Sequence, residues 1–205
     1  MNAARVVHLV DDDESFLKAT SRLLRASGFA VKTYSSPRDF LEQVANADFG
    51  CMVIDLQMPG MNGLEFQAAL SRSKHPLPVV FLTGQGDIPA SVDAMRNGAV
   101  DFLEKRAPKE KIIAAVHRAL ERATHEAQAK TELQKLRERF VSLSSRELEV
   151  LSHVVQGKLN KQIAADLGVC ERTVKAHRTA ITTKVGVPSV AELTRLVHEA
   201  GLFKA

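Results

Sequence analysis

Short apolar segments alternate with longer amphipathic segments over the first 122 residues of the chain. The apolar segments have the length of β-strands and barely alternate in polarity, which is typical of strands covered on both faces. They lie at Val6–Val10, Ala30–Tyr34, Met52–Leu56, Val79–Thr83 and Phe102–Leu103. The longer segments have helical periodicity and lie at about 14–27, 37–46, 63–73, 88–97 and from 109 onward. This alternation predicts an α/β domain over 1–122, with a parallel sheet and helices on both of its faces.

After residue 109 the helical periodicity continues and no further strand follows. One apolar stripe runs along 112–120, and a second joins Leu133, Leu136 and Phe140. This pattern predicts a long helix, or two consecutive helices, in which 123–140 links the first domain to the rest of the chain. The second stripe is either part of a solvated helix or a surface for pairing in a dimer or with a neighbouring domain.

The last part of the chain, 141–205, has the pattern of short helices. Ser144 and Glu147 have the spacing of a capping box ahead of an apolar run, and Gly157 ends that helix. Helices are then expected at Asn160–Leu167, at Glu171–Val185 and over 189–199. A short helix, a turn that contains Gly168 and a longer helix form the length pattern of a helix-turn-helix. We therefore expect an all-α domain of four helices here.

Composition excludes several classes of protein. The 205 residues are 45% hydrophobic and 25% charged, which is ordinary for a globular protein of two modest domains. No run approaches the roughly 18 apolar residues of a membrane span, and the start of the chain lacks the zones of a secretory signal. The 2 cysteines and 7 histidines show no metal-binding spacing, and Cys51 and Cys170 fit a reducing compartment. We expect a cytoplasmic protein that does not act at a membrane.

Charge is unevenly distributed along the chain. The net charge is +4, while residues 1–122 carry 15 basic and 15 acidic side chains and residues 141–205 carry 9 and 6. The basic excess at the end of the chain favours a polyanionic partner. Within it, the helix expected at Glu171–Val185 carries four basic side chains and one acidic one. That helix is either a solvated basic helix or one that binds DNA through its phosphates.

Polar side chains follow the predicted strands at one end of each. Asp11 and Asp12 follow the first strand, Asp55 ends the third, Thr83 ends the fourth and Lys105 follows the fifth. Because ligands of open α/β sheets bind at the carboxyl ends of the strands, these side chains can meet in one cleft. Crowded carboxylates attract Mg²⁺, and a carboxylate beside the ion can act as a nucleophile toward phosphorus. Each residue alone is typical of an ordinary structural role, but their coincidence favours a phosphoryl-transfer site.

These motifs resemble a known domain over residues 5–120, the receiver domain of two-component response regulators. The matching segments are Val10–Asp13, Ile54–Gly63, Leu82–Gly84 and Gly98–Lys105. The resemblance implies a flavodoxin-like (βα)5 fold in which Asp55 is the phosphoacceptor. It further implies that Mg²⁺ or Mn²⁺ is held by Asp11, Asp12, Asp55 and the backbone carbonyl of Gln57.

By the same resemblance, Thr83 and Lys105 contact the phosphoryl group and Phe102 is an aromatic switch, although Phe102 can also be a plain core residue. The chain departs from the family pattern after Lys105. The family usually has proline there, preceded by a cis peptide bond, and this chain has Arg106. A cis bond without proline costs roughly 2.5–4 kcal/mol. We therefore expect either a trans bond with a repositioned Lys105 or a strained cis bond.

Ser144–Gly186 resembles the LuxR-type output domain, and the two domains together resemble the NarL/FixJ family of response regulators. The side chains that this resemblance and the basic helix nominate for DNA contact are Lys161, Arg172, Thr173, Lys175, His177, Arg178 and Lys184. Two positions depart from the family pattern. Cys170 replaces the usual serine at the helix cap, which weakens the cap by about 1 kcal/mol if no other group substitutes. Ala180 stands where asparagine is common.

The resemblance implies a phosphorylation-dependent transcriptional regulator. A sensor histidine kinase would phosphorylate Asp55, and the phosphorylated chain would bind promoter DNA as a homodimer, with RNA polymerase as a further candidate partner. Such a protein is not an enzyme beyond its own aspartyl phosphorylation and dephosphorylation. Three alternatives stay open: a phosphohydrolase, although Gln57 stands where a second acid is often needed; a ligand-sensing LuxR-type regulator; and a regulator that works without phosphate.

Overall fold

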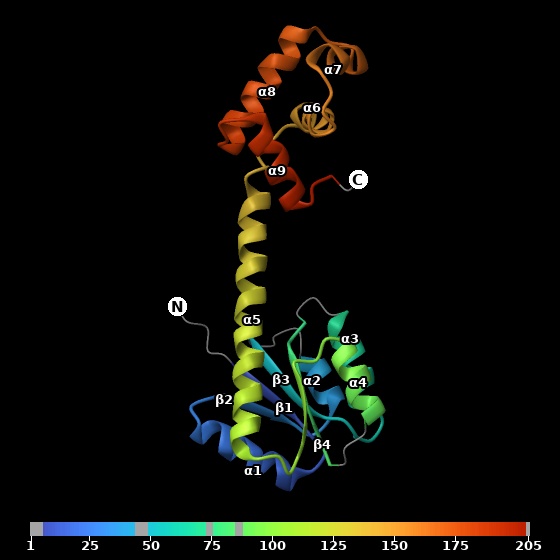
Figure 1. Cartoon of the computed structure of the whole chain (residues 1–205), viewed down its shortest axis with the longest axis vertical. Helices are drawn as coiled ribbons and strands as arrows, with labels where there is room; N and C mark the ends of the chain where they lie inside the picture. The colour runs from blue at the N-terminus through green and yellow to red at the C-terminus, as the bar shows by residue number, and fades with distance from the viewer. Residues whose placement is uncertain (1–5, 44–48, 73–75, 85–87, 204–205) are drawn as a thin grey trace. The chain divides into compact units, whose positions relative to one another are not determined.

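The computed structural model describes residues 6–43, 49–72, 76–84 and 88–203 (Figure 1). The chain divides into two compact units, Met1–Ala127 and Gln128–Ala205, and each is described by itself. The division falls inside the stretch 123–140 that the sequence predicts as a linker. Within the described residues, no helix is both long and apolar enough to cross a membrane.

The first unit is built on a five-stranded parallel sheet with the strand order β2-β1-β3-β4-β5. The strands are β1 (Val6–Val10), β2 (Ala30–Tyr34), β3 (Gly50–Asp55), β4 (Val79–Thr83) and β5 (Asp101–Glu104). All five predicted strands are present; β3 starts two residues earlier and ends one residue earlier than predicted, and β5 is one residue longer at each end. The predicted flavodoxin-like fold is confirmed.

Helices cover both faces of this sheet (Figure 1). They are α1 (Glu14–Ala26), α2 (Pro37–Gln43), α3 (Gly63–Ser71), α4 (Ile88–Arg96) and α5 (Lys109–Glu138). Side chains of α1 and α5 pack with β1, β3 and β4 in one apolar cluster, and side chains of α2, α3 and α4 pack on the opposite face in a second cluster. The second helix was expected to reach residue 46, and its last residues, 44–46, lie outside the described part of the chain.

Local sequence fixes the two loops that border the carboxyl end of the sheet. Asp13 caps α1, because its Oδ1 accepts hydrogen bonds from the backbone N–H groups of Ser15 and Phe16 at 2.8 and 3.1 Å. At the start of α3, a Cβ on Gly63 would lie 2.6 Å from the carbonyl oxygen of Asp55. Only glycine therefore lets α3 begin directly against the end of β3.

The helix α5 runs without interruption over Lys109–Glu138, so the first of the two predicted alternatives, one long helix, is confirmed. Its first half buries the predicted stripe, including Ile112, Val116 and Leu120. In its last turn, Leu136 packs against the apolar cluster of the second unit, together with Phe140 just beyond the helix. That contact accounts for two residues of the second stripe, whereas the third, Leu133, is half-buried and lies outside the cluster.

The second unit contains four further helices, as the sequence predicts: α6 (Ser145–Val155), α7 (Asn160–Leu167), α8 (Glu171–Val185) and α9 (Val190–Ala200). The capping box at Ser144 and Glu147 is present at the start of α6. Gly168 adopts a φ of 64°, which ends α7 and opens the turn to α8. The helices enclose one apolar cluster that includes Leu151, Ile163 and Ile181.

Two arginines at the end of α5 cap other helices of the second unit. Arg139 donates from Nε and Nη2 to the carbonyl of Val185, at 2.9 and 2.6 Å, and from Nη2 to that of Gly186 at 3.1 Å. Arg137 Nε donates to the carbonyl of Ala200 at 2.9 Å. Terminal carbonyls of a helix have no partner inside the helix and carry partial negative charge. The two guanidinium groups therefore stabilise the C-terminal ends of α8 and α9.

Candidate functional site

Three carboxylates converge at the carboxyl end of the sheet. Asp11 and Asp12 follow β1 and Asp55 ends β3, and one oxygen of each lies within 4.8 Å of the others. Asp11 and Asp55 are buried while Asp12 is exposed. The parallel strands explain this meeting, because their carboxyl ends share one edge of the sheet. The structure thus brings together the acidic residues that the sequence predicts.

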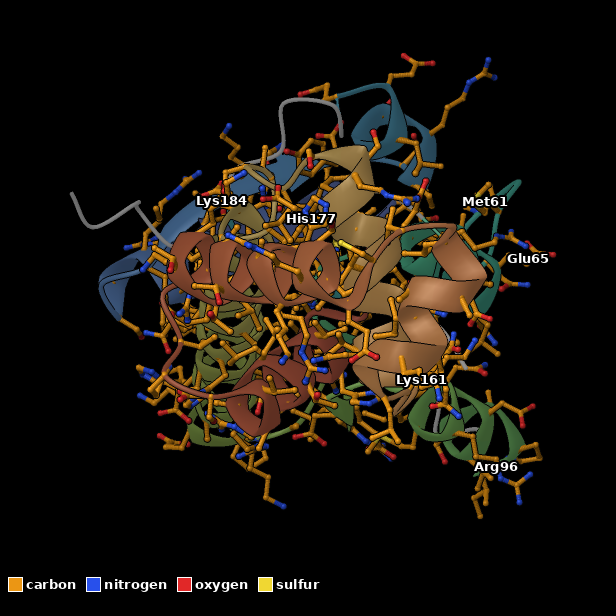
Figure 2. The ribbon with its side chains drawn as sticks, turned by 90° about the horizontal axis from the view of Figure 1, so that it is seen from above. Met61, Glu65, Arg96, Lys161, His177 and Lys184 are labelled. Carbon is orange, nitrogen blue, oxygen red and sulfur yellow. The ribbon has the colours of Figure 1, made fainter. Side chains whose placement is uncertain are left out.

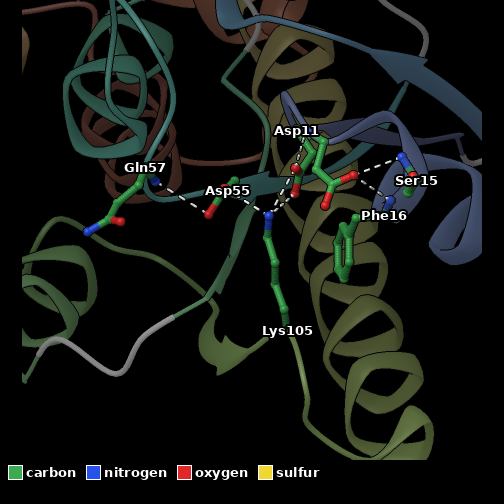
Figure 3. A network of polar contacts seen from close by, with 7 residues as sticks. Asp11, Ser15, Phe16, Asp55, Gln57 and Lys105 are labelled. Carbon is green, nitrogen blue, oxygen red and sulfur yellow. Dashed lines mark hydrogen bonds and ion pairs between the residues drawn. The ribbon is translucent and has the colours of Figure 1, made fainter.

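Lys105 reaches into this cluster from the loop after β5 (Figure 3). Its Nζ donates to Asp11 Oδ1 and to Asp55 Oδ2, both at 2.9 Å. Its backbone N–H donates to the carbonyl of Thr83 at 2.7 Å, which ties the loop to the end of β4. The lysine therefore bridges the predicted phosphoacceptor and a predicted metal ligand.

The absence of a proline after Lys105 does not prevent the lysine from reaching Asp11 and Asp55. The described residues contain no cis peptide bond, so the bond after Lys105 is trans, as in the first of the two predicted alternatives, while the repositioning of Lys105 that went with it stays a prediction. The turn that follows is closed by a backbone hydrogen bond from Ala107 to Glu104 at 2.8 Å and by an ion pair between Arg106 and Glu104 at 2.6 Å. These local contacts close the turn without a proline.

Burial and the hydrogen bonds of Lys105 dominate the electrostatics at the site. Burial raises the pKa of Asp11, and the nearby Asp55 adds to this, although hydrogen bonds from Lys105 and from the backbone of Asp13 oppose it. Burial acts to lower the pKa of Lys105, but its hydrogen bonds to Asp11 and Asp55 outweigh that effect and raise the pKa. The ammonium group therefore remains charged at neutral pH.

The donor set fits a hard divalent cation. The three carboxylates of the cluster face a single ammonium group among the described residues, so negative charge is in excess. Asp11 Oδ2 is buried and lies 2.7 Å from Lys105 Nζ without the geometry of a hydrogen bond. Carboxylate oxygens in this arrangement suit Mg²⁺, which also keeps waters and binds phosphate oxygens.

Of the remaining predicted residues of the first unit, Gln57 contacts the acceptor, and Thr83 and Phe102 lie on β4 and β5. The backbone N–H of Gln57 donates to Asp55 Oδ1 at 3.3 Å, so the main chain at Gln57 lies next to the carboxylate. Thr83 is fully buried at the end of β4. Phe102, in β5, is half-buried, and its ring centroid lies 6.0 Å from that of Phe81. The carbonyl of Gln57 as a metal ligand and Phe102 as a switch stay predictions.

Sequence reasoning missed one residue of the site, Phe16. Lys105 Nζ lies 4.6 Å from the centroid of the Phe16 ring, within the range of a cation–π contact (Figure 3). Phe16 stands in the first turn of α1, where Asp13 holds its backbone N–H. Its position three residues after the capping aspartate places Phe16 in the first turn of α1 but does not specify its contact with Lys105.

The second unit presents the predicted helix-turn-helix. Lys161 projects from α7, and His177 and Lys184 project from α8, where they stand seven positions apart (Figure 2). Of the seven nominated side chains, those of Lys161, Arg172, Lys175 and Lys184 are exposed, and those of Thr173, His177 and Arg178 are half-buried. The exposed members are all cationic, which is the pattern that neutralises phosphates.

Two of the nominated residues also hold the helices together. Arg178 Nη1 donates to Asn160 Oδ1 at 2.6 Å, which ties α8 to the start of α7. Lys184 Nζ donates to the buried Glu147 of α6 at 2.8 Å. The hydrogen bond from Lys184 and those from Ser144 lower the pKa of Glu147 to about 2.

Cys170 occupies the residue before α8 without capping it. Its side chain makes no hydrogen bond to the helix backbone, and its Sγ lies 3.2 Å from Thr173 Oγ1. The hydrogen bond to Thr173 lowers the pKa of the thiol. The start of α8 therefore lacks the side-chain cap that a serine would supply.

Comparisons with known proteins agree with both units. The family model of the response regulator receiver domain matches residues 7–117, and that of the luxR family of bacterial regulatory proteins matches residues 141–197. The response regulator protein TmoT of Ectopseudomonas mendocina is 40% identical over 94% of this chain and 88% of its own length.

Two solved structures extend the likeness to nearly the whole chain. The response regulator StyR is 40% identical, covers 96% of this chain and 100% of its own, and has a TM-score of 0.77. Full-length FixJ from B. japonicum is 33% identical, covers 99% and 100%, and has a TM-score of 0.60. The chain therefore belongs to the two-component response regulators of the FixJ-like group, which join a receiver domain to a LuxR-type DNA-binding domain and regulate transcription.

Proposed function

We propose that Asp55 accepts a phosphoryl group from a sensor histidine kinase and that this phosphorylation controls promoter binding by the helix-turn-helix. The observation that carries the proposal is the Lys105 ammonium group, 2.9 Å from the Asp55 carboxylate at the mouth of a three-carboxylate cluster. An acceptor needs a carboxylate, a neighbouring cation for the phosphoryl oxygens and ligands for a divalent ion. The three requirements are met by residues of three different strand ends.

In the proposed transfer, an Asp55 oxygen forms a bond to phosphorus as the bond from phosphorus to the donor histidine nitrogen breaks. The electron pair of that bond leaves with the imidazole, and an acyl phosphate remains on Asp55. Mg²⁺ or Mn²⁺, held by Asp11, Asp12, Asp55 and the carbonyl of Gln57, would supply positive charge that offsets the incoming phosphoryl group.

The other groups act on the phosphoryl oxygens. Lys105 exchanges its hydrogen bond to Asp55 for one to a phosphoryl oxygen, and the Thr83 hydroxyl donates a second. The movement of Thr83 leaves room that Phe102 takes by turning inward, so that the surface around β5 changes. The half-buried Phe102 beside Phe81 supports this role, because its ring has a buried neighbour and a solvent side.

The changed receiver pairs with a second copy, and the homodimer presents two α8 helices to paired half-sites on promoter DNA. The nominated contacts are Lys161, Arg172, Thr173, Lys175, His177, Arg178 and Lys184. RNA polymerase is a further proposed partner, and the cytoplasm is the proposed location. The boundaries proposed for these functions are 1–122 for the receiver, 123–140 for the linker and 141–205 for the output domain.

The test uses Asp55→Asn in the full chain. Wild type and variant are incubated with acetyl phosphate and Mg²⁺, phosphorylation is measured by intact mass, and oligomeric state by light scattering. We expect wild type to gain one phosphoryl group and to dimerise, and the variant to do neither. Glu110→Gln, which removes an exposed carboxylate at the start of α5, serves as the matched control and should behave as wild type. Equal phosphorylation of Asp55→Asn and wild type would overturn the proposal.

A further inference from the structure

The loop that carries Lys105 lacks the usual means of aiming a side chain. The peptide bond after Lys105 is trans, and the ion pair that closes the turn, between Arg106 and Glu104, involves an exposed arginine. A lysine has a flexible stem of four carbons and loses considerable rotamer freedom when it is held in one position. The position of the Lys105 ammonium group therefore depends on contacts of the side chain itself, and its hydrogen bonds to Asp11 and Asp55 are two of them.

Phe16 provides such a contact. Lys105 Nζ lies 4.6 Å from the centroid of its ring while remaining 2.9 Å from both Asp11 and Asp55. Figure 3 shows the ring beside the lysine, on the side of α1, with the carboxylates at the end of the side chain. Phe16 is itself fixed, because its backbone N–H is bound by Asp13 and its side chain packs against the apolar cluster of α1 and α5.

We propose that Phe16 is a positioning residue for phosphoryl transfer to Asp55 and acts by holding the Lys105 ammonium group beside the acceptor. The proposal rests on the proposed function. An aromatic face attracts a cation without accepting its N–H groups in directed hydrogen bonds. All three N–H groups of Lys105 therefore remain available, to the two carboxylates at rest and to phosphoryl oxygens during transfer.

The geometry also explains why this residue matters more here than in a chain with proline after the lysine. Proline would restrict the backbone at Lys105 and so limit the directions of the side chain. In this chain the Lys105 side chain is instead restricted at its ammonium end, through the contact with the Phe16 ring. Loss of the ring leaves the lysine able to reach Asp55 but spreads its ammonium group over more positions.

A double-mutant cycle separates this role from a contribution to folding. Wild type, Phe16→Leu, Lys105→Ala and the double variant are phosphorylated with phosphoramidate at saturating Mg²⁺, and the rate constant is measured. We expect Phe16→Leu to lower the rate about three- to tenfold, the range of a cation–π contact at a partly exposed site. In the Lys105→Ala background, Phe16→Leu should have no further effect.

Two further variants serve as controls. Phe16→Tyr keeps the aromatic face and should restore the wild-type rate. Phe29→Leu removes a half-buried ring that packs on the same apolar cluster but contacts His117 rather than Lys105, and it should leave the rate unchanged. If Phe16→Leu does not fold, Phe16→Met takes its place in the cycle, because methionine fills the space with an adaptable side chain.

The outcomes are distinguishable. An equal loss of rate from Phe16→Leu with and without Lys105 would overturn the positioning role, and so would a failure of Phe16→Tyr to restore the rate. Absence of phosphorylation in wild type itself would instead overturn the proposed function. A wild-type rate in Phe16→Leu would show that the turn alone aims Lys105 and would also overturn the inference.

Discussion

Single side chains with two partners decide much of the chemistry and stability of this protein. Lys105 joins Asp11 and Asp55 at the carboxyl end of the sheet. In the second unit, Lys184 joins α8 to the buried Glu147, which at the same time completes the capping box of α6. A buried carboxylate with an ammonium partner and a backbone N–H donor is stabilised in its charged form.

This second cluster predicts a pH dependence of stability. The pKa of Glu147 is lowered to about 2 from an ordinary value of 4.5, first by Lys184 and then by Ser144. The stabilisation is therefore complete above pH 4.5 and is lost as the pH falls from 4.5 toward 2. Glu147→Gln should remove this dependence and lower stability at pH 7 by about 1.5–3 kcal/mol, the range of a hydrogen bond to a charged group.

Hydrogen exchange of the α6–α8 peptides in the full chain measures the effect against pH. Glu149→Gln, on the same helix but exposed, is the matched control, and its profile should follow that of wild type. An unchanged pH profile in Glu147→Gln would contradict the assignment of the titration to this residue.

At the scale of elements, the helices of both units begin and end where side chains satisfy their terminal groups. Asp13 caps the start of α1 and Ser144 caps the start of α6, and the local sequence indicates both caps. The caps that Arg137 and Arg139 supply to α9 and α8 could not be predicted from the sequence, because they depend on which helices pack near the end of α5. Sequence patterns indicate local caps, whereas a cap supplied from another element requires the tertiary structure.

The Arg139 cap gives a prediction at this scale. Arg139→Gln removes the charged hydrogen bonds to the carbonyls of Val185 and Gly186, and we expect the end of α8 to lose about 1–2 kcal/mol of stability. Hydrogen exchange of α8 amides in the full chain should show the loss. Arg195→Gln, which removes an exposed ion pair on α9, should change protection by less than about 0.5 kcal/mol. Equal effects of the two variants would count against a specific cap.

At the scale of the whole molecule, the alternation of strands and helices was sufficient to predict an α/β domain with a parallel sheet, and the pattern of short helices was sufficient to predict the four-helix unit. The flavodoxin-like receiver fold was implied by the resemblance of the motifs to the receiver family. Asp11, Asp12 and Asp55 could be predicted to meet because each ends or follows a parallel strand, and strand ends share an edge. The contact of Phe16 with Lys105 could not be predicted, because it depends on the direction of a loop and on two side-chain conformations. The same reason applies to the trans peptide after Lys105, for which the sequence left two alternatives.

The three-carboxylate cluster predicts a response of the first unit to metal. Mg²⁺ that binds only the folded state stabilises it, by about 2.7 kcal/mol when its concentration is 100 times its dissociation constant. We expect millimolar Mg²⁺ to raise the unfolding temperature of the receiver unit in wild type and to have little effect in Asp12→Asn. Without metal, Asp12→Asn should be at least as stable as wild type, because it removes repulsion among the carboxylates. Calorimetry of the full chain measures both effects.

Glu14→Gln provides the matched control, since this exposed carboxylate pairs with Lys18 on α1 and lies outside the cluster. Its response to Mg²⁺ should equal that of wild type. A full response in Asp12→Asn would exclude Asp12 from the metal site.

The hydrogen bonds from Lys105 to Asp11 and Asp55 also make this lysine a competitor of the divalent cation. The ammonium group and a divalent cation bind the same carboxylate oxygens. Each therefore lowers the affinity of these oxygens for the other by an equal factor. At rest the lysine acts as a built-in counter-ion that keeps the buried charges tolerable. A substitution that weakens the hydrogen bonds of Lys105 to the carboxylates should therefore raise the affinity for the divalent cation. The same substitution should lower the rate of phosphoryl transfer, so the two quantities change in opposite directions.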